Sequence, residues 1–235
     1  MNQPYQFSLH STFDRVELPV KEIDVYWVDA LDWPTERLEE LMGILTLADQ
    51  AEMAGFTCAK KRQNFCLSRG LLRVLLGTYL GVAPADIGFE RNRWGKLQLP
   101  GQSLHFNLSH SGTRIVFALS RLYEVGVDIE QIRPLRCLDR LVRRYCTPAE
   151  QVICQGLSLP EKTRFFLQSW VAKEAYAKAW GTGLAGLIKH FSGLETIRGA
   201  HLGIRGGWWA QWQPLALGPQ YVGAVCWGIT RDATA

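Results

Sequence analysis

The segment TLADQ, Thr46–Gln50, recurs 101 residues later as TPAEQ, Thr147–Gln151. At the same offset YWVD, Tyr26–Asp29, lies over VDIE, Val127–Glu130, so a segment of strand character precedes the repeated turn in both places. Self-similarity at a fixed offset is the signature of a repeated structural unit. The sequence therefore predicts a duplicated unit made of a strand, helices and then several strands.

A third match lies further along the chain, where GTYL at Gly77–Leu80 and GTGL at Gly181–Leu184 are each predicted to close a long helix. The expected fold is α/β (α+β), with two similar strand-helix-sheet halves, residues 1–120 and 121–235, related by a pseudo-twofold. A cleft between such halves is a natural place for a site. Trp27 stands in the first half where Asp128 stands in the second, so the chemistry is expected in the second half.

Composition sets the class of protein. The chain has 235 residues, 47% of them hydrophobic, which is enough for a core without covalent staples. Its six cysteines show no C-x-x-C pair, the opening MNQPYQFSLH lacks the form of a secretion signal, and no apolar run approaches a membrane span. We therefore expect a cytoplasmic protein with reduced thiols and no membrane partner. The net charge of +4 suits an anionic partner without naming one.

The stretch YEVGVDIEQI, Tyr123–Ile132, places two acids in a predicted strand. Side chains alternate between the faces of a strand, so Asp128 and Glu130 share one face while Val127 and Ile129 point to the other. Adjacent carboxylates repel and raise a pKa unless a cation or water lies between them. The face is therefore either solvated or holds a metal.

A long helix is predicted over SLPEKTRFFLQSWVAKEAYAKAWGTG, with Pro160 in its first turn and Gly181 at its C-terminal cap. Glu174 and Lys178 are four residues apart, which fits a surface pair worth roughly 0.2 to 0.5 kcal/mol. The other interpretation makes Glu174 a third carboxylate, with Lys173 and Lys178 beside it to hold phosphates. Magnesium is commonly bound by such carboxylates together with phosphate oxygens.

The segment SLHFNLSHSG, Ser103–Gly112, alternates apolar and polar residues and is predicted to turn at His110, Ser111 and Gly112 before a second strand. Such a turn is most often only a hairpin. Its hydroxyls and imidazole would also suit contact with a phosphate at a cleft.

Taken in order, FNLSHSG, GVDIE and WVAKEAYAKAWGTGL closely resemble motifs of the 4′-phosphopantetheinyl transferases of the larger, surfactin-synthetase-activating (Sfp) type. WGKLQLP and FCLSRGLLRVLL resemble further segments of this family, and the resemblance runs from about Phe56 to Leu184. It implies a pseudo-dimeric α/β fold in a monomer. It also implies transfer of the phosphopantetheine arm of coenzyme A to a serine of an apo acyl or peptidyl carrier protein, with release of 3′-phosphoadenosine 5′-phosphate.

The resemblance also implies roles for individual residues. Magnesium, with manganese as the alternative, would be held by Asp128, Glu130 and Glu174. Coenzyme A would be bound by Arg69 and His110 at its 3′-phosphate end, by Lys96 near the nucleotide, and by Lys173 and Lys178 near the phosphates, with Ser109 as a weaker candidate for a contact. Gly55 departs from the basic residue common in the family, and the alternatives for that contact are Lys60, Lys61 and Arg62. For Arg73, one turn after Arg69, a solvated face is expected.

Glu150 has two open interpretations. It matches the family's proposed base for the serine proton, which would place it with Glu174 and Lys178 among the catalytic residues. TPAE is equally a capping box, in which Thr147 caps a helix and Glu150 reaches back to it. The counterpart TLAD favours capping, because Asp49 belongs to the half without the acid pair.

The segment RPLRCLDRLVRRYC places Arg136, Arg140 and Arg143 or Arg144 at helical spacing, opposite Leu138, Leu141, Val142 and Tyr145. Such a stripe is either a solvated face or, beside this site, a docking surface for an acidic carrier helix. A nuclease or nucleic-acid-binding protein is disfavoured, because the aromatic residues do not interleave with the basic runs. A catalytically dead coenzyme A-binding scaffold is disfavoured because all three acids are present.

Overall fold

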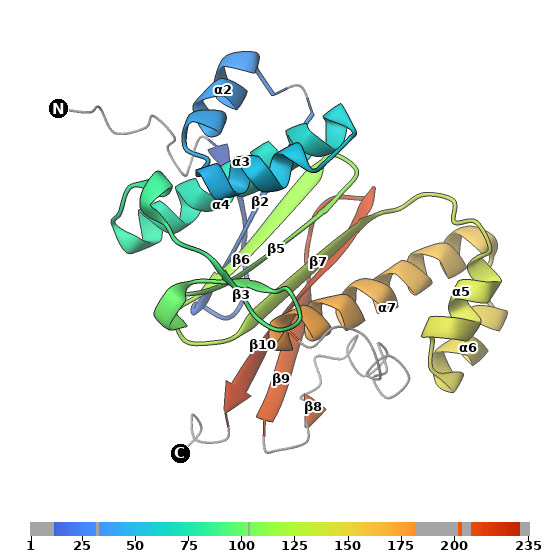
Figure 1. Cartoon of the computed structure of the whole chain (residues 1–235). Coiled ribbons are helices and arrows are strands. Elements are labelled where there is room, and N and C mark those ends of the chain that lie inside the picture. The colour runs from blue at the N-terminus through green and yellow to red at the C-terminus, as the bar shows by residue number, and fades with distance from the viewer. Residues whose placement is uncertain (1–11, 32, 103, 182–201, 204–207, 231–235) are drawn as a thin grey trace.

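The computed structural model describes residues 12–31, 33–102, 104–181, 202–203 and 208–230 (Figure 1). Two four-stranded antiparallel sheets form its centre. The first has the order β1 (Asp14–Val16), β2 (Ile23–Asp29), β6 (Arg114–Ser120) and β5 (His105–Ser111). The second has the order β7 (Val125–Gln131), β10 (Tyr221–Thr230), β9 (Trp208–Pro214) and β8 (Leu202–Gly203). A small hairpin of β3 (Glu90–Arg91) and β4 (Leu97–Gln98) lies apart from both sheets.

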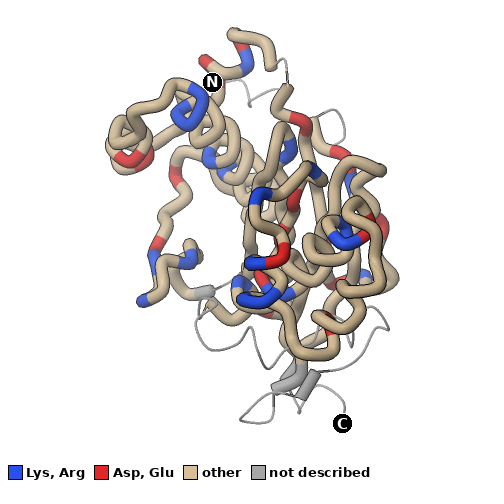
Figure 2. Tube along the Cα trace, turned by 90° about the vertical axis from the view of Figure 1, so that its right-hand side faces the viewer, with Lys and Arg blue, Asp and Glu red and all other residues tan. Residues whose placement is uncertain are grey.

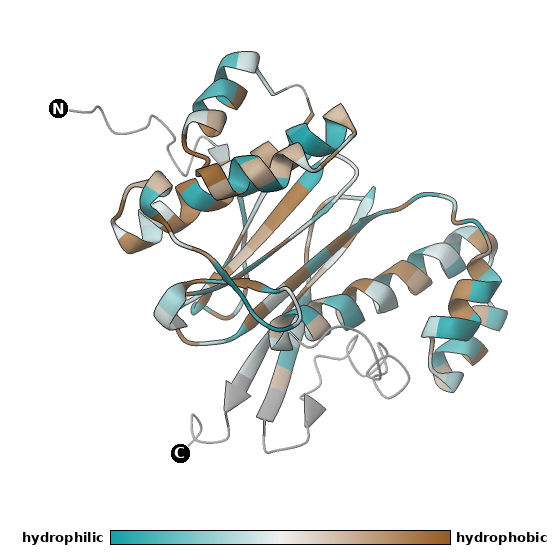
Figure 3. Ribbon diagram, in the orientation of Figure 1, coloured by the Kyte–Doolittle hydropathy of each residue, from teal (hydrophilic) through white to brown (hydrophobic). Residues whose placement is uncertain are grey.

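Each half of the chain supplies one long helix with shorter helices beside it. The first half has α2 (Thr35–Gly43), α3 (Leu47–Ala54) and α4 (Ala59–Leu80), and the second has α5 (Leu138–Tyr145), α6 (Pro148–Gln155) and α7 (Leu159–Trp180). Short 3₁₀ turns span Pro84–Asp86 and Pro100–Gln102. The helices alternate hydrophobic and hydrophilic residues, as expected when one side of each packs on a core (Figure 3).

The predicted mixed α/β class and the order of elements are confirmed. A strand, a capped short helix, a 22-residue helix and two further strands occur in both halves, as β2, α3, α4, β5, β6 and as β7, α6, α7, β9, β10. Both predicted capping boxes are present, Thr46 with Asp49 and Thr147 with Glu150. The pseudo-twofold relation and the boundary near residue 120 stay predictions.

The segments GTYL and GTGL lie at the ends of the two long helices, as predicted, but their glycines are not equivalent. The helix α4 continues past Gly77 and ends at Leu80, and its cap is Gly81, which adopts a left-handed conformation with φ of 69°. Gly181 caps α7 in the same way with φ of 59°, so Gly81 is its counterpart. Gly77 is instead a point of close approach, because a Cβ there would lie 2.9 Å from the carbonyl oxygen of Val82. The rest of the second copy, residues 182–184, lies outside the described residues.

Gly126 determines how closely α7 approaches the second sheet. A Cβ at this position would lie 2.1 Å from the carbonyl oxygen of Ala175 and 2.2 Å from the amide nitrogen of Ala179. Any larger residue would push the helix off β7. The acids on β7 and the carboxylate of Glu174 on α7 are therefore kept close together.

Side chains of β5 join the two sheets at the edge of β7. The amide of Val127 donates a hydrogen bond to Asn107 Oδ1 at 2.9 Å, and the amide of Gln131 donates to Ser111 Oγ at 3.0 Å. The polar face of β5 thus satisfies backbone donors of β7 that would otherwise form an open sheet edge. We call this contact the seam.

Among the described helices, none combines the length and apolar character that a bilayer span requires. All six cysteines are free thiols, as predicted.

Candidate functional site

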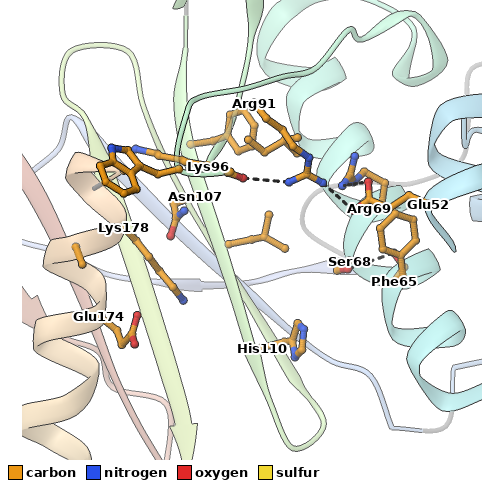
Figure 4. Close-up of a pocket in the computed structure, with 17 residues that line it drawn as sticks. Glu52, Phe65, Ser68, Arg69, Arg91, Lys96, Asn107, His110, Glu174 and Lys178 are labelled. Atoms are coloured by element: carbon orange, nitrogen blue, oxygen red, sulfur yellow. Dashed lines mark hydrogen bonds and ion pairs between the residues drawn. The ribbon is translucent and has the colours of Figure 1, made fainter. Parts of the chain in front are cut away.

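A cavity of about 420 Å³ opens between the two halves, where α4, the β3–β4 hairpin, β5 and α7 face one another (Figure 4). Five residues predicted from the sequence line it, namely Arg69, Lys96, His110, Glu174 and Lys178. Asp128, Glu130, Ser109, Lys173 and Glu150 are not among the lining residues. The cavity is basic on the α4 and hairpin side and carries Glu174 and Lys178 on the α7 side.

The guanidinium of Arg69 is fixed at the α4 side of the cavity. Its Nη1 lies 2.8 Å from Asp49 Oδ1, and its side chain is only 10% exposed. The rings of Phe65 and Phe89 lie 5.0 and 5.2 Å from its central carbon. Burial lowers the pKa of Arg69 and the charge of Asp49 opposes this, yet a guanidinium remains protonated in proteins. Arg69 therefore presents a held positive charge to the cavity.

Arg91 and Glu52 line the cavity and were not predicted from the sequence. Arg91 Nη2 lies 2.7 Å from Glu52 Oε1. The signal that could have found Arg91 is its place in ERNRWGK, shortly before the Gly-Lys segment. Arg91 adds a basic residue to the cavity lining, whereas Lys60 and Lys61 do not line the cavity.

Arg62, the third alternative for the contact missing at Gly55, is turned to the backbone. Its Nη1 donates hydrogen bonds to the carbonyl oxygens of Phe56 at 2.7 Å and of Thr57 at 3.2 Å. It does not line the cavity.

Asp128 and Glu130 share one face of β7, as the alternation predicted. Ser109 Oγ donates to Asp128 Oδ1 at 2.7 Å, and Ser111 Oγ donates to Glu130 Oε2 at 2.8 Å. Of the two alternatives for this face, the solvated one does not hold for Asp128, which is 5% exposed because β5 covers it. Ser109 thus holds an acid in place rather than facing the cavity.

The ammonium of Lys178 lies among the acids. Its Nζ is 2.6 Å from Asp128 Oδ1 and 3.0 Å from Ser109 Oγ. The ion pair of Lys178 is therefore with Asp128 and not with Glu174, the partner that a helical surface pair requires. Figure 4 shows Lys178 and Glu174 projecting from α7 toward the same space.

The three predicted metal-binding carboxylates interact electrostatically. Burial and the charge of Asp128 raise the pKa of Glu174 to about 7, against the opposing charge of Lys178. Burial also raises the pKa of Glu130, which a hydrogen bond from Ser111 partly offsets and the charge of Asp128 reinforces. Burial and the charge of Lys178 lower the pKa of His110. The site holds more negative charge than Lys178 neutralises.

Magnesium fits the chemistry of these donors but not a preformed cage. Carboxylate oxygens are the ligands that this ion prefers, and the raised pKa of Glu174 marks a place where a further cation would be stabilised. Over the described residues, however, no three His, Cys, Asp or Glu side chains already converge as a metal site. Magnesium usually keeps several waters and binds one or two carboxylates together with substrate phosphates, so a preformed set of three side chains is not needed to hold it.

Lys173 and Glu150 form an ion pair inside the second half, away from the cavity lining. Lys173 Nζ lies 2.6 Å from Glu150 Oε2, and the two side chains are 2% and 0% exposed. Glu150 also accepts a hydrogen bond from Ser169 Oγ at 2.5 Å and one from the amide of Thr147 at 2.6 Å. Lys173 completes its contacts at the carbonyl oxygen of Tyr145, 2.8 Å away.

The first half contains the counterpart of this pair. Arg73 Nε donates to Asp49 Oδ2 at 2.7 Å, and Asp49 is the capping-box acid of α3. The predicted solvated face for Arg73 is wrong, because its side chain is 2% exposed and also bonds the carbonyl oxygens of Pro84 and Ile87. A buried cation on the long helix therefore pairs with the capping acid in both halves.

Lys96 reaches through the hairpin to the end of α7. Its Nζ lies 2.8 Å from Glu124 Oε2 and 2.8 Å from the carbonyl oxygen of Ala179. Burial alone would raise the pKa of Glu124, but hydrogen bonds from His105 and Lys96 and the charge of Lys96 lower it to about 2. Asn92 Nδ2 donates to the carbonyl oxygen of Gly181 at 3.2 Å. The hairpin is therefore clamped to the C-terminus of α7.

Comparison with known proteins gives the family. Residues 124–226 match the family model described as the 4′-phosphopantetheinyl transferase superfamily. The chain is 35% identical over 165 residues to the 4′-phosphopantetheinyl transferase HetI of Nostoc sp., an alignment that covers 68% of this chain and 70% of that protein. The chain belongs to the 4′-phosphopantetheinyl transferase family.

Two further relatives of this transferase show how the similarity is distributed. It is 30% identical over 161 residues to a 4′-phosphopantetheinyl transferase of Bacillus subtilis, which covers 63% of this chain and 70% of the relative. It is 37% identical over 109 residues to the 4′-phosphopantetheinyl transferase AcpT of Escherichia coli, with 46% and 55% covered. The residues matched by the family model include all three acids predicted to bind the metal. Arg69, Lys96 and His110 precede the matched range.

Proposed function

We propose that the protein transfers the 4′-phosphopantetheine arm of coenzyme A to a serine of an apo acyl or peptidyl carrier protein. The products are the holo carrier and 3′-phosphoadenosine 5′-phosphate. The observation that carries this proposal is the arrangement of one cavity, with Arg69, Arg91 and His110 on one side and Glu174 and Lys178 on the other. Coenzyme A bears a 3′-phosphate and a pyrophosphate, so its site needs cations and donors at separated points.

In the proposed reaction the serine oxygen forms a bond to the phosphorus nearest the pantetheine arm. The bond from that phosphorus to the bridging oxygen breaks, and the bridging oxygen leaves with 3′-phosphoadenosine 5′-phosphate. The serine proton must pass to a base. Lys178 would stabilise the negative charge that grows on the pyrophosphate, because its ammonium lies where the cavity meets Asp128.

Magnesium would be held by Asp128, Glu130 and Glu174, with manganese as the alternative. When bound, the ion would supply positive charge that neutralises these carboxylates and stabilises the pyrophosphate. Ser109 and Ser111 would orient two of the acids through the hydrogen bonds they donate. The roles of these residues are thus to hold the cation and to place it at the α7 side of the cavity.

For Glu150 and Lys173 we propose a structural role. A general base must come within hydrogen-bond reach of the proton it removes, directly or through one water. Glu150 is 0% exposed, and its oxygens already accept hydrogen bonds from Lys173, Ser169 and the amide of Thr147. The equivalent pair, Asp49 with Arg73, lies in the half of the chain that lacks the acid cluster. This supports a role in helix capping and core stabilisation for both pairs.

The carrier is proposed to dock at α5. Figure 2 looks onto the side that carries this helix and shows basic segments there. Leu138 and Val142 are buried, while the basic side chains are exposed, namely Arg136, Arg140, Arg143 and Arg144. An acidic carrier helix would be attracted to this face. Because one chain supplies both walls of the cavity, we propose that the protein acts as a monomer. We also propose that it acts without nucleic acid.

The decisive experiment incubates the protein with coenzyme A, magnesium and a panel of apo carriers. We expect at least one carrier to gain the mass of one phosphopantetheine arm, with an equal amount of 3′-phosphoadenosine 5′-phosphate released. Asp128→Asn is the matched control, because it keeps the shape of the side chain and removes its charge. Labelling that is absent from every carrier, or equal in the control, would contradict the proposal.

A further inference from the structure

Glu52 bridges the two arginines of the cavity. It lies in the last turn of α3, and its Oε1 is 2.7 Å from Arg91 Nη2 on β3. Its Oε2 is 3.4 Å from Arg69 Nη2 on α4. Figure 4 shows this carboxylate facing both guanidinium groups at the edge of the cavity.

Arg69 does not need Glu52 to be held in place. Asp49 already binds its other terminal nitrogen at 2.8 Å, and the rings of Phe65 and Phe89 lie beside it. Glu52 is also poorly placed for its own helix, because a negative charge in the last turn opposes the helix dipole. Within the described structure, Asp49 therefore already holds Arg69 in place, and Glu52 is not needed for that purpose.

The partners of Glu52 are the groups that would bind a phosphate. A carboxylate and a phosphate compete for guanidinium groups, because both present oxygens that accept two parallel hydrogen bonds. The side chains of Glu52 and Arg91 are 40% and 47% exposed, so this ion pair can open without exposing a core. Arg69, at 10%, stays fixed while the pair opens.

We propose that Glu52 is an internal counter-anion, which occupies Arg69 and Arg91 in the free protein and competes with the phosphate of a bound ligand. This inference rests on the proposed function for the identity of the ligand. The 3′-phosphate of coenzyme A stays on the leaving product, so competition by Glu52 weakens retention of 3′-phosphoadenosine 5′-phosphate as well. Glu52 is thus a residue that sets affinity and product release without taking part in the chemistry.

The test measures binding by calorimetry to wild type and Glu52→Gln. Because a partly exposed ion pair is worth up to about 1 kcal/mol, we expect the variant to bind coenzyme A and 3′-phosphoadenosine 5′-phosphate about 2- to 5-fold more tightly. Dephospho-coenzyme A, which lacks the 3′-phosphate, should bind both proteins equally. Glu90→Gln is the control, since Glu90 precedes Arg91 on the same strand, is exposed and does not line the cavity.

Unchanged or weaker binding of coenzyme A to Glu52→Gln would overturn the proposal, and weaker binding would mean that Glu52 orients Arg91. If wild type binds neither coenzyme A nor 3′-phosphoadenosine 5′-phosphate, the proposed function fails. The role of Glu52 is then tested separately with inorganic phosphate. Phosphate should raise the thermal midpoint of Glu52→Gln more than that of wild type and of Glu90→Gln. Equal rises of the thermal midpoint in all three proteins would contradict the proposal that Glu52 is a counter-anion.

Discussion

At the scale of single residues, the carboxyl of Glu174 is hard to ionise where it lies. Burial and Asp128 raise its pKa to about 7, from 4.5, while Lys178 opposes the shift. A carboxyl whose pKa is higher in the folded state contributes stability below its unfolded pKa and loses that contribution as the pH rises through its folded pKa. The loss for Glu174 therefore falls between about pH 4.5 and 7.

We expect Glu174→Gln to remove this loss in metal-free buffer. As the pH rises from about 4.5 to 7, the thermal midpoint of wild type should fall relative to that of the variant, and it should stay lower at higher pH. Magnesium should narrow the difference at pH 8 by stabilising the ionised carboxylate. The measurement is calorimetric unfolding across this pH range, with Glu39→Gln on the exposed side of α2 as control. Parallel curves for wild type and Glu174→Gln would argue against the shift.

The buried pairs of the two halves predict matched effects on stability. Glu150→Gln leaves the Lys173 charge buried without its ion-pair partner, and Asp49→Asn does the same to Arg73. Each variant should lower the free energy of unfolding in urea by roughly 3 kcal/mol. Turnover per folded molecule should stay close to wild type in Glu150→Gln, whereas Asp49→Asn also removes the ion pair that fixes Arg69 and should weaken coenzyme A binding. A stable Glu150→Gln protein with steeply reduced turnover would instead identify Glu150 as the base.

Some of these residues could be placed from the sequence and some could not. Alternation along a strand put Asp128 and Glu130 on one face, and the capping motif identified Thr147 with Glu150, because both signals act within a few residues. Arg73 could not be placed, since its partner Asp49 lies 24 residues earlier. Helical spacing alone cannot distinguish a solvated arginine from a buried one.

At the scale of secondary-structure elements, the β3–β4 hairpin forms a wall of the cavity through its clamp on α7. Lys96 and Glu124 hold it there, so each should matter even without contact to a nucleotide. Lys96→Met and Glu124→Gln should both weaken coenzyme A binding and lower the thermal midpoint. The double variant should be less impaired than the sum of the single ones, because the two residues act as one contact.

The measurement for this clamp is a double-mutant cycle on the coenzyme A dissociation constant. Glu90→Gln on the same hairpin is the control. If Lys96 contacts the nucleotide directly, Lys96→Met should weaken binding while Glu124→Gln leaves it intact. That result would restore the role that the family resemblance implies for Lys96.

The basic side of α5 gives a prediction about encounter with the carrier. Reversing Arg140 and Arg144 to Glu should raise the KM for an acidic carrier and leave coenzyme A affinity nearly unchanged. The wild-type KM should rise with salt, since screening shortens the range of the attraction. Steady-state kinetics at several salt concentrations measure both effects, with Lys60 and Lys61 in the exposed first turn of α4 reversed as control. If the KM for the carrier changes neither with the charge reversal nor with salt, α5 is not the docking surface.

The ends of helices could be predicted where the sequence carries a local signal, such as a proline in the first turn or a glycine at the C-terminal cap. Pro160 and Gly181 marked the ends of α7 correctly, because proline suits a first turn and glycine a left-handed cap. Gly77 was matched to Gly181, but it lies inside α4 and is not a cap. Its small size serves the close passage of the chain at Val82, which is a tertiary contact with no local signature.

At the scale of the whole molecule, the internal repeat predicted the order of elements in each half. It did not predict which strands of the two halves meet. That contact depends on Asn107 and Ser111 of β5. The predicted hairpin is present, since β5 pairs with β6, but these two side chains also bond the backbone of β7, which the sequence did not indicate. The cavity depends on this arrangement, because Arg69 and His110 come from one half and Glu174 from the other.

The seam has a consequence for the exchange of backbone hydrogens with solvent. The amides of Val127 and Gln131 are covered by side chains of another sheet, so their exchange requires the two halves to separate locally. Asn107→Ala should speed exchange at Val127 and leave Gln131 protected, and Ser111→Ala should do the reverse. Hydrogen exchange followed by nuclear magnetic resonance would show this without ligand, metal or carrier. These two amides therefore serve as native probes of how firmly the halves of the molecule hold together.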